Sequence, residues 1–336
     1  MSDDYLWDRS GAPDPEVERL EELLSQYRHR GPATLALPAR VSFFGSWLRP
    51  LAPPAAGLTA FAAVVLLAAA GFWLLRSPAA GWEVVSLAGT PRVGSEALEG
   101  TGRLPVGEWL ETDAASRARI SVGLIGTVEV EPRSRLQLVR AQARDHRLAL
   151  ARGRMRARIW APPRLFFVET PAALAVDLGC VYTLEVDAAG AGLLRVESGW
   201  VQLESESRGS VVPAGAVAAM SPGAGPGAPF YPEASEAFKS SLMTLDFGGA
   251  QDRAAALSIL LAEARREDSI TLLTQLARLE AEDRGRVYDR LAVLLPPPAG
   301  VTREGIVRGE QKMIDDWWTR LGVASPRKWK FWTSAD

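Results

Sequence analysis

Four alternating arginines are the residues of this sequence whose type and spacing best suit a chemical role. They are Arg152, Arg154, Arg156 and Arg158. Successive side chains of a β-strand point to opposite faces, so this spacing predicts four guanidinium groups on one face of a strand. Such a face could bind an anion: a lipid phosphate, a cell-wall carboxylate or an acidic partner.

The alternative, which we favour, is a solvated face on which these arginines pair with carboxylates of neighbouring strands. Exposed ion pairs of this kind are common and contribute little beyond solubility. The expected acidic partners are Glu129, Glu131, Glu197 and Glu204.

The sequence contains no pattern typical of a catalytic or metal-binding site. The one cysteine, Cys180, has apolar neighbours and no nearby histidine, which predicts a buried and unreactive thiol. The two histidines, His29 and His146, are far apart in the chain. Phosphate-binding loops, zinc-protease motifs and nucleophile elbows are not found. We therefore expect no catalytic residue, no metal, no cofactor and no enzymatic activity.

An uncharged apolar stretch at residues 55–75 predicts a membrane-spanning helix that divides the chain. No Asp, Glu, Lys, Arg or His lies between Arg49 and Arg76, an interval long enough for a helix to cross a bilayer of about 30 Å. Basic residues precede the stretch and are scarce after it, which predicts a cytoplasmic N-terminus and a periplasmic remainder. The expected location is the bacterial inner membrane, as a single-pass protein.

Residues 1–30 are predicted to be a cytoplasmic tail that contains an amphipathic helix. The helix is expected to start at Asp14 and Pro15. The helix could dock on a cytoplasmic partner, or it could fold back on the membrane surface or on Trp7. The candidate docking residues are Trp7, Val17, Leu20, Leu24 and Tyr27. Residues 31–54 hold several prolines and are predicted to be a linker.

The rest of the chain changes from a strand pattern to a helix pattern. Residues 82–221 alternate apolar and polar types between Gly, Pro and Asp turns, which predicts a sandwich or roll of short antiparallel strands. A Gly/Pro linker at 222–232 precedes a helical domain at 233–322 and a basic, aromatic tail at 323–336. In the helical domain, Asp268 is expected to cap a helix, and residues 302–321 are expected to form one last helix. The expected fold class is therefore mixed and multi-domain: one transmembrane helix, an all-β domain and an α-helical C-terminal domain.

The β region resembles the FecR domain, the periplasmic domain of FecR-type regulators of iron-uptake signalling. The matching runs, in order, are GTPRVG (89–94), GEWLETD (107–113), ARISV (118–122), IGTVEVEPRSRLQL (125–138), LALARG (148–153), FFVETP (166–171), LRVESGWVQL (194–203) and VPAG (212–215). LGCVY (178–182) departs from the Gly-Thr-aromatic run that is more usual in the family. The helical C-terminal region is a second departure.

The resemblance implies a signalling protein that controls a transcription factor, most simply an extracytoplasmic-function sigma factor held by the cytoplasmic helix. The alternative is a membrane-anchored envelope scaffold without a transcriptional role. The expected partners are the lipid bilayer, the sigma factor, and a periplasmic protein or the cell wall. With a formal net charge of −2, the chain shows no general attraction for nucleic acid, and we expect none as a partner.

Overall fold

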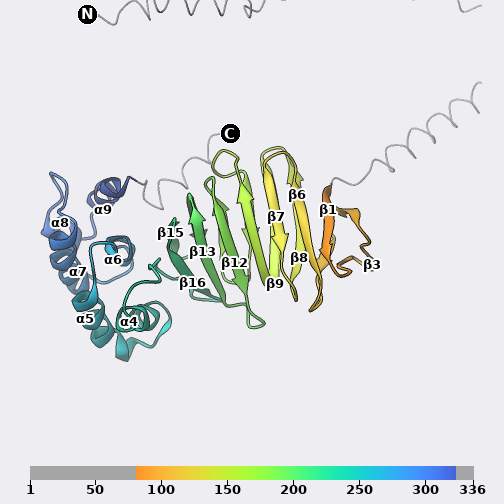
Figure 1. Ribbon diagram of the computed structural model, residues 1–336. Coiled ribbons are helices and arrows are strands. Elements are labelled where there is room, and N and C mark those ends of the chain that lie inside the picture. Colours follow the sequence, from red (N-terminus) through yellow and green to blue (C-terminus); the bar gives the residue numbers. More distant parts are fainter. Residues whose placement is uncertain (1–80, 323–336) are drawn as a thin grey trace, which may run out of the picture. The chain divides into compact units, whose positions relative to one another are not determined.

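The structure is a computed structural model that describes residues 81–322 (Figure 1). Residues 81–226, in which apolar and polar types alternate, form seventeen strands, and helices follow them. The strands form two layers that share one long strand, β9 (Asp145–Ile159). The structure thus has the predicted order of a β-rich region followed by helices.

The first layer contains the second half of β9 and eight further strands, all paired antiparallel. In spatial order they are β4 (Thr101–Pro105), β1 (Gly81–Ala88), β6 (Arg117–Val122), β7 (Gly126–Val130), β9, β12 (Val181–Val186), β13 (Gly192–Ser198), β16 (Val217–Ser221) and β17 (Gly225–Pro226).

The second layer contains the first half of β9 and eight other strands. In spatial order they are β3 (Glu96–Ala97), β2 (Arg92–Val93), β5 (Trp109–Glu111), β8 (Arg135–Gln142), β9, β10 (Phe166–Glu169), β11 (Leu174–Asp177), β14 (Trp200–Glu204) and β15 (Gly209–Pro213). The pair of β9 with β10 is parallel, whereas only antiparallel pairs were expected.

Strand β9 changes layers at Gly153, where its inward-facing positions change from even to odd numbers. Gly153 has φ of 96°, and a Cβ there would lie 2.3 Å from the Ser134 Oγ. That hydroxyl accepts a hydrogen bond from the Arg154 N–H at 2.9 Å and so bridges the strands where the register shifts. Only glycine fits both the backbone angle and the close approach.

Side chains from both layers fill the space between them. Buried residues such as Leu104, Ile120, Leu148, Phe166 and Tyr182 belong to one continuous hydrophobic cluster. The polar positions of the same strands therefore lie on the outer faces, as alternation requires.

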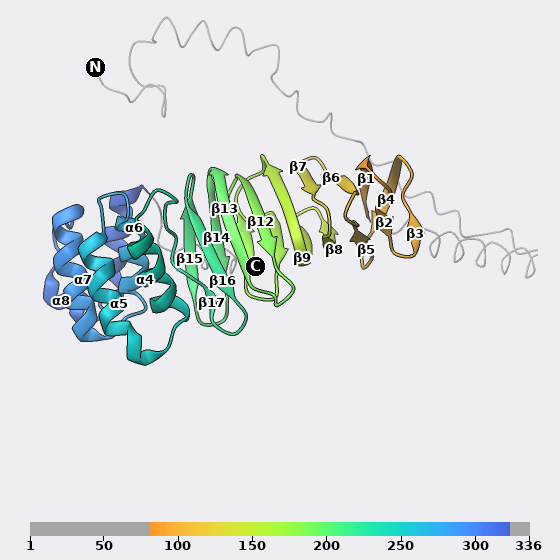
Figure 2. The same ribbon diagram turned by 60° about the horizontal axis from the view of Figure 1, so that its bottom comes forward.

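The helices follow the last strand and form their own core (Figure 2). They are α4 (Glu236–Phe247), α5 (Arg253–Glu263), α6 (Ser269–Leu276), α7 (Ala281–Leu294), α8 (Arg303–Val307) and α9 (Gln311–Trp318), with short 3-10 turns η1 (Ala250–Asp252) and η2 (Thr319–Leu321). All eight residues of α6 are buried. Val211 of β15 and Ala228 belong to the helical core as well, so the two regions pack against each other.

Three details of the helical region differ from the sequence prediction. Helix α4 was not predicted, although Ser235 caps it by accepting a hydrogen bond from the Phe238 N–H at 3.1 Å. The single helix expected over 302–321 is divided at Gly309, whose φ is 74°. Asp268 occupies the predicted cap position of α6, but its carboxylate makes no capping bond there.

The segment 222–232, predicted as an open Gly/Pro linker, is packed. Residues 225–229 are buried, β17 pairs with β16, and Val217 and Phe230 form a bridge. Its glycines and prolines therefore serve close packing between the strands and the helices.

The predicted fold class needs a correction at its membrane-spanning helix. Within residues 81–322, every helix is too short or too polar to cross a membrane. The apolar stretch at 55–75, to which that helix was assigned, lies outside the described residues. The structure therefore supports a fold class of a large, mostly β region followed by helices.

Candidate partner-binding face

The outer face of the first layer carries three of the four predicted arginines. Arg154, Arg156 and Arg158 lie on the second half of β9 and point outward. Arg152 lies before the change of layer, where it pairs in register with Arg135 of the second layer. The sequence predicted all four on one face because their spacing does not reveal that β9 passes from one layer to the other, with a register shift between Leu150 and Arg152.

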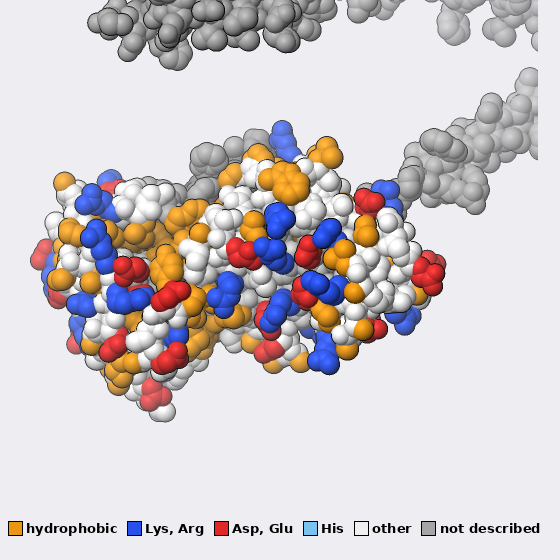
Figure 3. Space-filling model, in the orientation of Figure 1, with side chains coloured by type: hydrophobic (Ala, Val, Ile, Leu, Met, Phe, Trp, Pro, Cys, Tyr) orange, Lys and Arg blue, Asp and Glu red, His pale blue; other side chains and the backbone are white. Residues whose placement is uncertain are grey.

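Carboxylates of neighbouring strands bind two of these arginines. Arg154 contacts Glu185 at 2.7 Å, and Arg156 forms a two-pronged pair with Glu197 at 2.8 and 2.5 Å. The hydrogen bond between Arg156 and Glu197 lowers the pKa of the carboxyl and raises the pKa of the guanidinium. Figure 3 shows the result, with basic and acidic side chains interleaved over the middle strands.

Arg158 differs from its neighbours, because its row across the layer carries no carboxylate. Thr127 of β7 and Val181 of β12 are its two cross-strand neighbours. Ser121 and Ser198 continue the row beyond them. Within residues 81–322, the Arg158 side chain forms no hydrogen bond or ion pair; it acts on Glu197 through its charge, but that carboxylate is already bound by Arg156.

A buried cluster of ionisable groups lies at the end of β11. The Asp177 carboxylate accepts hydrogen bonds from the Gly179 N–H at 2.7 Å and the Cys180 Sγ–H at 2.5 Å. Burial raises the pKa of Asp177 to about 6, and it also raises the pKa values of Cys180 and Tyr182. Cys180 is buried, as its apolar neighbours predicted, but Asp177, three residues earlier, was missed.

A second buried cluster joins the helices to the β region. The Asp246 carboxylate of α4 accepts from Arg278 Nη1 at 2.8 Å, Gln275 Nε2 at 3.0 Å and the Ala228 N–H at 2.7 Å. Arg278 also donates to the Ser210 hydroxyl of β15 at 2.7 Å. Burial lowers the pKa of Arg278, opposed by the charge of Asp246. Asp246 and Arg278 are far apart in the sequence, and no local pattern there predicts that they form an ion pair.

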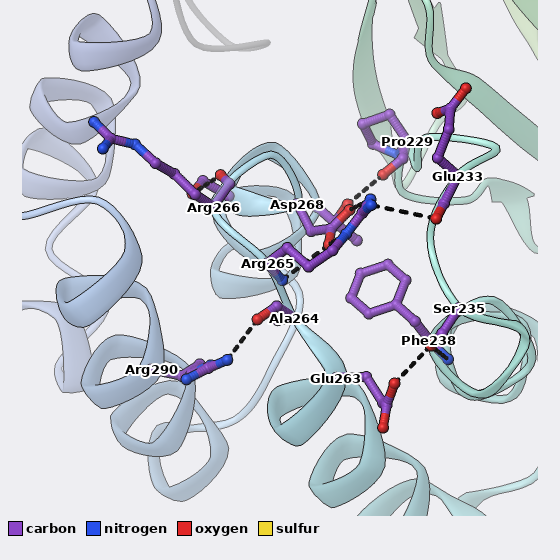
Figure 4. Close-up of polar contacts among 12 residues, drawn as sticks. Pro229, Glu233, Ser235, Phe238, Glu263, Ala264, Arg265, Arg266, Asp268 and Arg290 are labelled. Carbon is purple, nitrogen blue, oxygen red and sulfur yellow. Dashed lines mark hydrogen bonds and ion pairs between the residues drawn. The ribbon is translucent and has the colours of Figure 1, made fainter.

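A third polar cluster connects the turn between α5 and α6 to its surroundings (Figure 4). Arg265 donates through its backbone N–H and its guanidinium to Asp268, and reaches the Glu233 carbonyl at 3.2 Å. Arg290 of α7 donates to the Ala264 carbonyl on the other side. The Asp268 carboxylate, predicted to cap α6, is thus used to fix the turn.

The candidate docking residues of the N-terminal helix, Trp7, Val17, Leu20, Leu24 and Tyr27, lie outside the described residues. The structure therefore describes only the arginine part of the two predicted binding surfaces. Of its four arginines, Arg154 and Arg156 are ion-paired, whereas Arg152 and Arg158 form no ion pair with a described residue.

Comparison with known proteins gives distant similarity only. No protein-family model and no curated protein matches the sequence. Two crystal structures of a candidate anti-sigma factor from Parabacteroides distasonis, at 1.65 and 2.50 Å resolution, are similar over 33% of this chain and 53% of theirs. Each has 10% sequence identity and a TM-score of 0.30. The chain thus spans about half the length of these structures.

Proposed function

We propose that this chain is a regulatory binding protein of the FecR type that controls an extracytoplasmic-function sigma factor. The sigma factor would be bound through the predicted N-terminal helix around Trp7–Tyr27. The β region would be the module that receives the signal through its outer surface, because its interior is filled by apolar side chains.

One observation carries the proposal: glycines within the FecR-like runs shape turns of the β region and the point where β9 changes layers. Gly94, Gly153, Gly199 and Gly215 have φ values of 57°, 96°, 74° and 81°. Residues other than glycine rarely adopt these angles, so the runs that carry the resemblance are those that determine the chain's path. Similarity at such positions supports a shared β architecture more strongly than similarity at exposed strand positions.

The test changes the predicted helix within the full chain. Leu20→Asp combined with Leu24→Asp places two charges on the apolar face, whereas Glu22→Gln changes the opposite face and is the matched control. We expect the double variant to lose co-purification with the sigma factor and to change transcription of its target genes. Glu22→Gln should behave as the wild type.

Unchanged transcription in the double variant would favour the alternative, an envelope scaffold. The inner-membrane location, with bilayer and periplasmic or cell-wall partners, stays a prediction. Fractionation of cells that express the tagged full chain tests the location independently of the sigma factor.

A further inference from the structure

We propose that the end of the arginine face formed by Arg158, Trp160 and Leu124 binds a protein segment that presents an apolar side chain next to a carboxylate. We call these three residues the Trp160 tip. The inference concerns the β region alone and goes beyond the proposed sigma-factor role, so either could fail without the other.

Apolar exposure is the first argument. Trp160 immediately follows β9 and Leu124 lies in the turn between β6 and β7, and their exposed fractions are 63% and 94%. Both exceed the exposure of most large apolar side chains in the described part of the chain, where such residues fill the cores. Trp and Arg are the residue types that most often dominate binding energy at protein interfaces.

Order is the second argument. The Trp160 N–H donates to the Ile125 carbonyl at 3.0 Å, which continues the pairing of β9 with β7 by one residue. The indole Nε1–H donates to the Leu124 carbonyl at 3.2 Å. The ring's only donor is therefore satisfied within the chain, and a partner meets an apolar surface. A side chain held in this way loses less entropy on binding than a free one.

Charge is the third argument, and it determines the partner's chemistry. Arg158 precedes Trp160 by two residues and is flanked by Thr127 and Val181, which carry no charge. A partner carboxylate at this position would meet a guanidinium that forms no ion pair with any residue of the described range. The neighbouring Arg156 is different, because its Nε and Nη2 groups already donate to the Glu197 carboxylate.

A membrane surface fits these features less well than a protein. Stable attraction to anionic lipid takes several Lys or Arg side chains together, since each contributes only a modest amount. The tip offers a single arginine, Arg158, whose charge also acts on the Glu197 carboxylate. A Trp side chain next to an Arg side chain is instead typical of the residues that contribute most binding energy at protein–protein interfaces.

The experiment uses a displayed library of random dodecapeptides selected on the full chain, with counter-selection on Trp160→Ala. We expect recovered peptides to share an aromatic or aliphatic residue next to Asp or Glu. One recovered peptide, made synthetically, is then titrated against each variant. Trp160→Ala should weaken binding about thirtyfold and Arg158→Gln about tenfold.

Arg195→Gln is the matched control, because Arg195 is also exposed and forms no ion pair with a described residue. It lies on β13 in the row of Arg156, two strands and four residues along from Trp160, which is about 16 Å by strand geometry. It should change the affinity less than twofold. Circular dichroism of each variant should match that of the wild type, which separates lost binding from lost folding.

Three results would overturn the proposal. The first is a selection that yields no peptide dependent on Trp160, and the second is equal weakening by Arg195→Gln and Arg158→Gln. The third comes from a parallel titration with vesicles of phosphatidylglycerol and phosphatidylethanolamine. Binding of vesicles that is lost in Trp160→Ala, without peptide binding, would make the tip a lipid-binding site.

Discussion

Removal of Arg278 tests whether the helices and the β region are joined by the buried pair with Asp246. The Arg278→Ala variant leaves the Asp246 carboxylate, whose side chain is 1% exposed, without its cationic partner. It also removes the donors that reach the Ser210 hydroxyl and the Gly209 carbonyl. Breaking a buried pair from one side typically costs about 3–5 kcal/mol. We expect a loss of that size in the free energy of unfolding.

This loss is a large part of the stability of an ordinary domain, which is about 5–15 kcal/mol. Because the pair links β15 to the helices, we expect the helices to unfold at a lower urea concentration than the strands. Urea titrations followed by circular dichroism at a helix wavelength and at a strand wavelength would report the two regions separately. The wild type should show coincident transitions.

Two controls make the result specific. Arg303→Ala removes a two-pronged pair with Asp289 at 2.7 and 3.0 Å that lies at the surface, and should leave the urea midpoint nearly unchanged. Asp246→Leu combined with Arg278→Met replaces the pair by apolar groups and should recover much of the loss. A midpoint for Arg278→Ala equal to that of Arg303→Ala would refute the reasoning.

Three further measurements test other parts of the fold. Asp177 has its pKa raised from 3.8 to about 6 in the folded state, so the folded state binds a proton more tightly. Its stabilising contribution, about 3 kcal/mol, is fully present below about pH 4 and is lost as the pH rises through about 6. Unfolding titrations at several pH values should show a smaller decline of the free energy of unfolding with pH in Asp177→Asn than in the wild type. Burial lowers the pKa of His146, so that residue makes the free energy of unfolding rise with pH instead. Gly153→Ala should lower the free energy of unfolding by at least about 2 kcal/mol, because φ is 96° and the Ser134 Oγ is 2.3 Å from the new Cβ; Gly100→Ala, with φ of 75° and open space, should cost less. Arg156→Gln should cost under about 1 kcal/mol by the same assay, since its pair with Glu197 is exposed, and a larger loss would mean that this pair supports the layer.

Local patterns predicted much of the β region, because strand alternation and turn glycines act over a few residues. The same locality explains the errors in the helices. Helix α4 has Phe238, Leu242 and Leu245 at helical spacing, a local signal that indicates a helix there. The break at Gly309 depends on a glycine with positive φ inside a run that otherwise has helical periodicity. A single glycine does not reveal whether it ends a helix or is tolerated within one.

The buried clusters could not be predicted, because their members are distant in the sequence. Arg278 and Asp246 lie 32 residues apart, and Arg278 and Ser210 lie 68 apart. Taken alone, each of these polar residues is of a type that usually lies at the solvated surface. Only the packing of α6 against the strand end of the β region turns them into a buried pair.

The arginine face shows where the limit of sequence reasoning lies. Each of the four glutamates expected to neutralise the arginine run does bind an arginine, but only Glu197 binds a member of that run, Arg156. The pairs formed by the other three are Arg119 with Glu129, Arg117 with Glu131 and Arg164 with Glu204.

Charge balance is a property of the whole face and could be inferred from composition. Partner choice depends on register, which composition does not reveal: Glu185 lies opposite Arg154, whereas Thr127 and Val181 lie opposite Arg158. The row of Arg158 holds Thr127 and Val181 and no carboxylate. Whether an arginine of this face meets an acid is thus decided by the register of β9 with β7 and β12, and at Arg158 that register places a cation without a cross-strand acid next to the exposed Trp160.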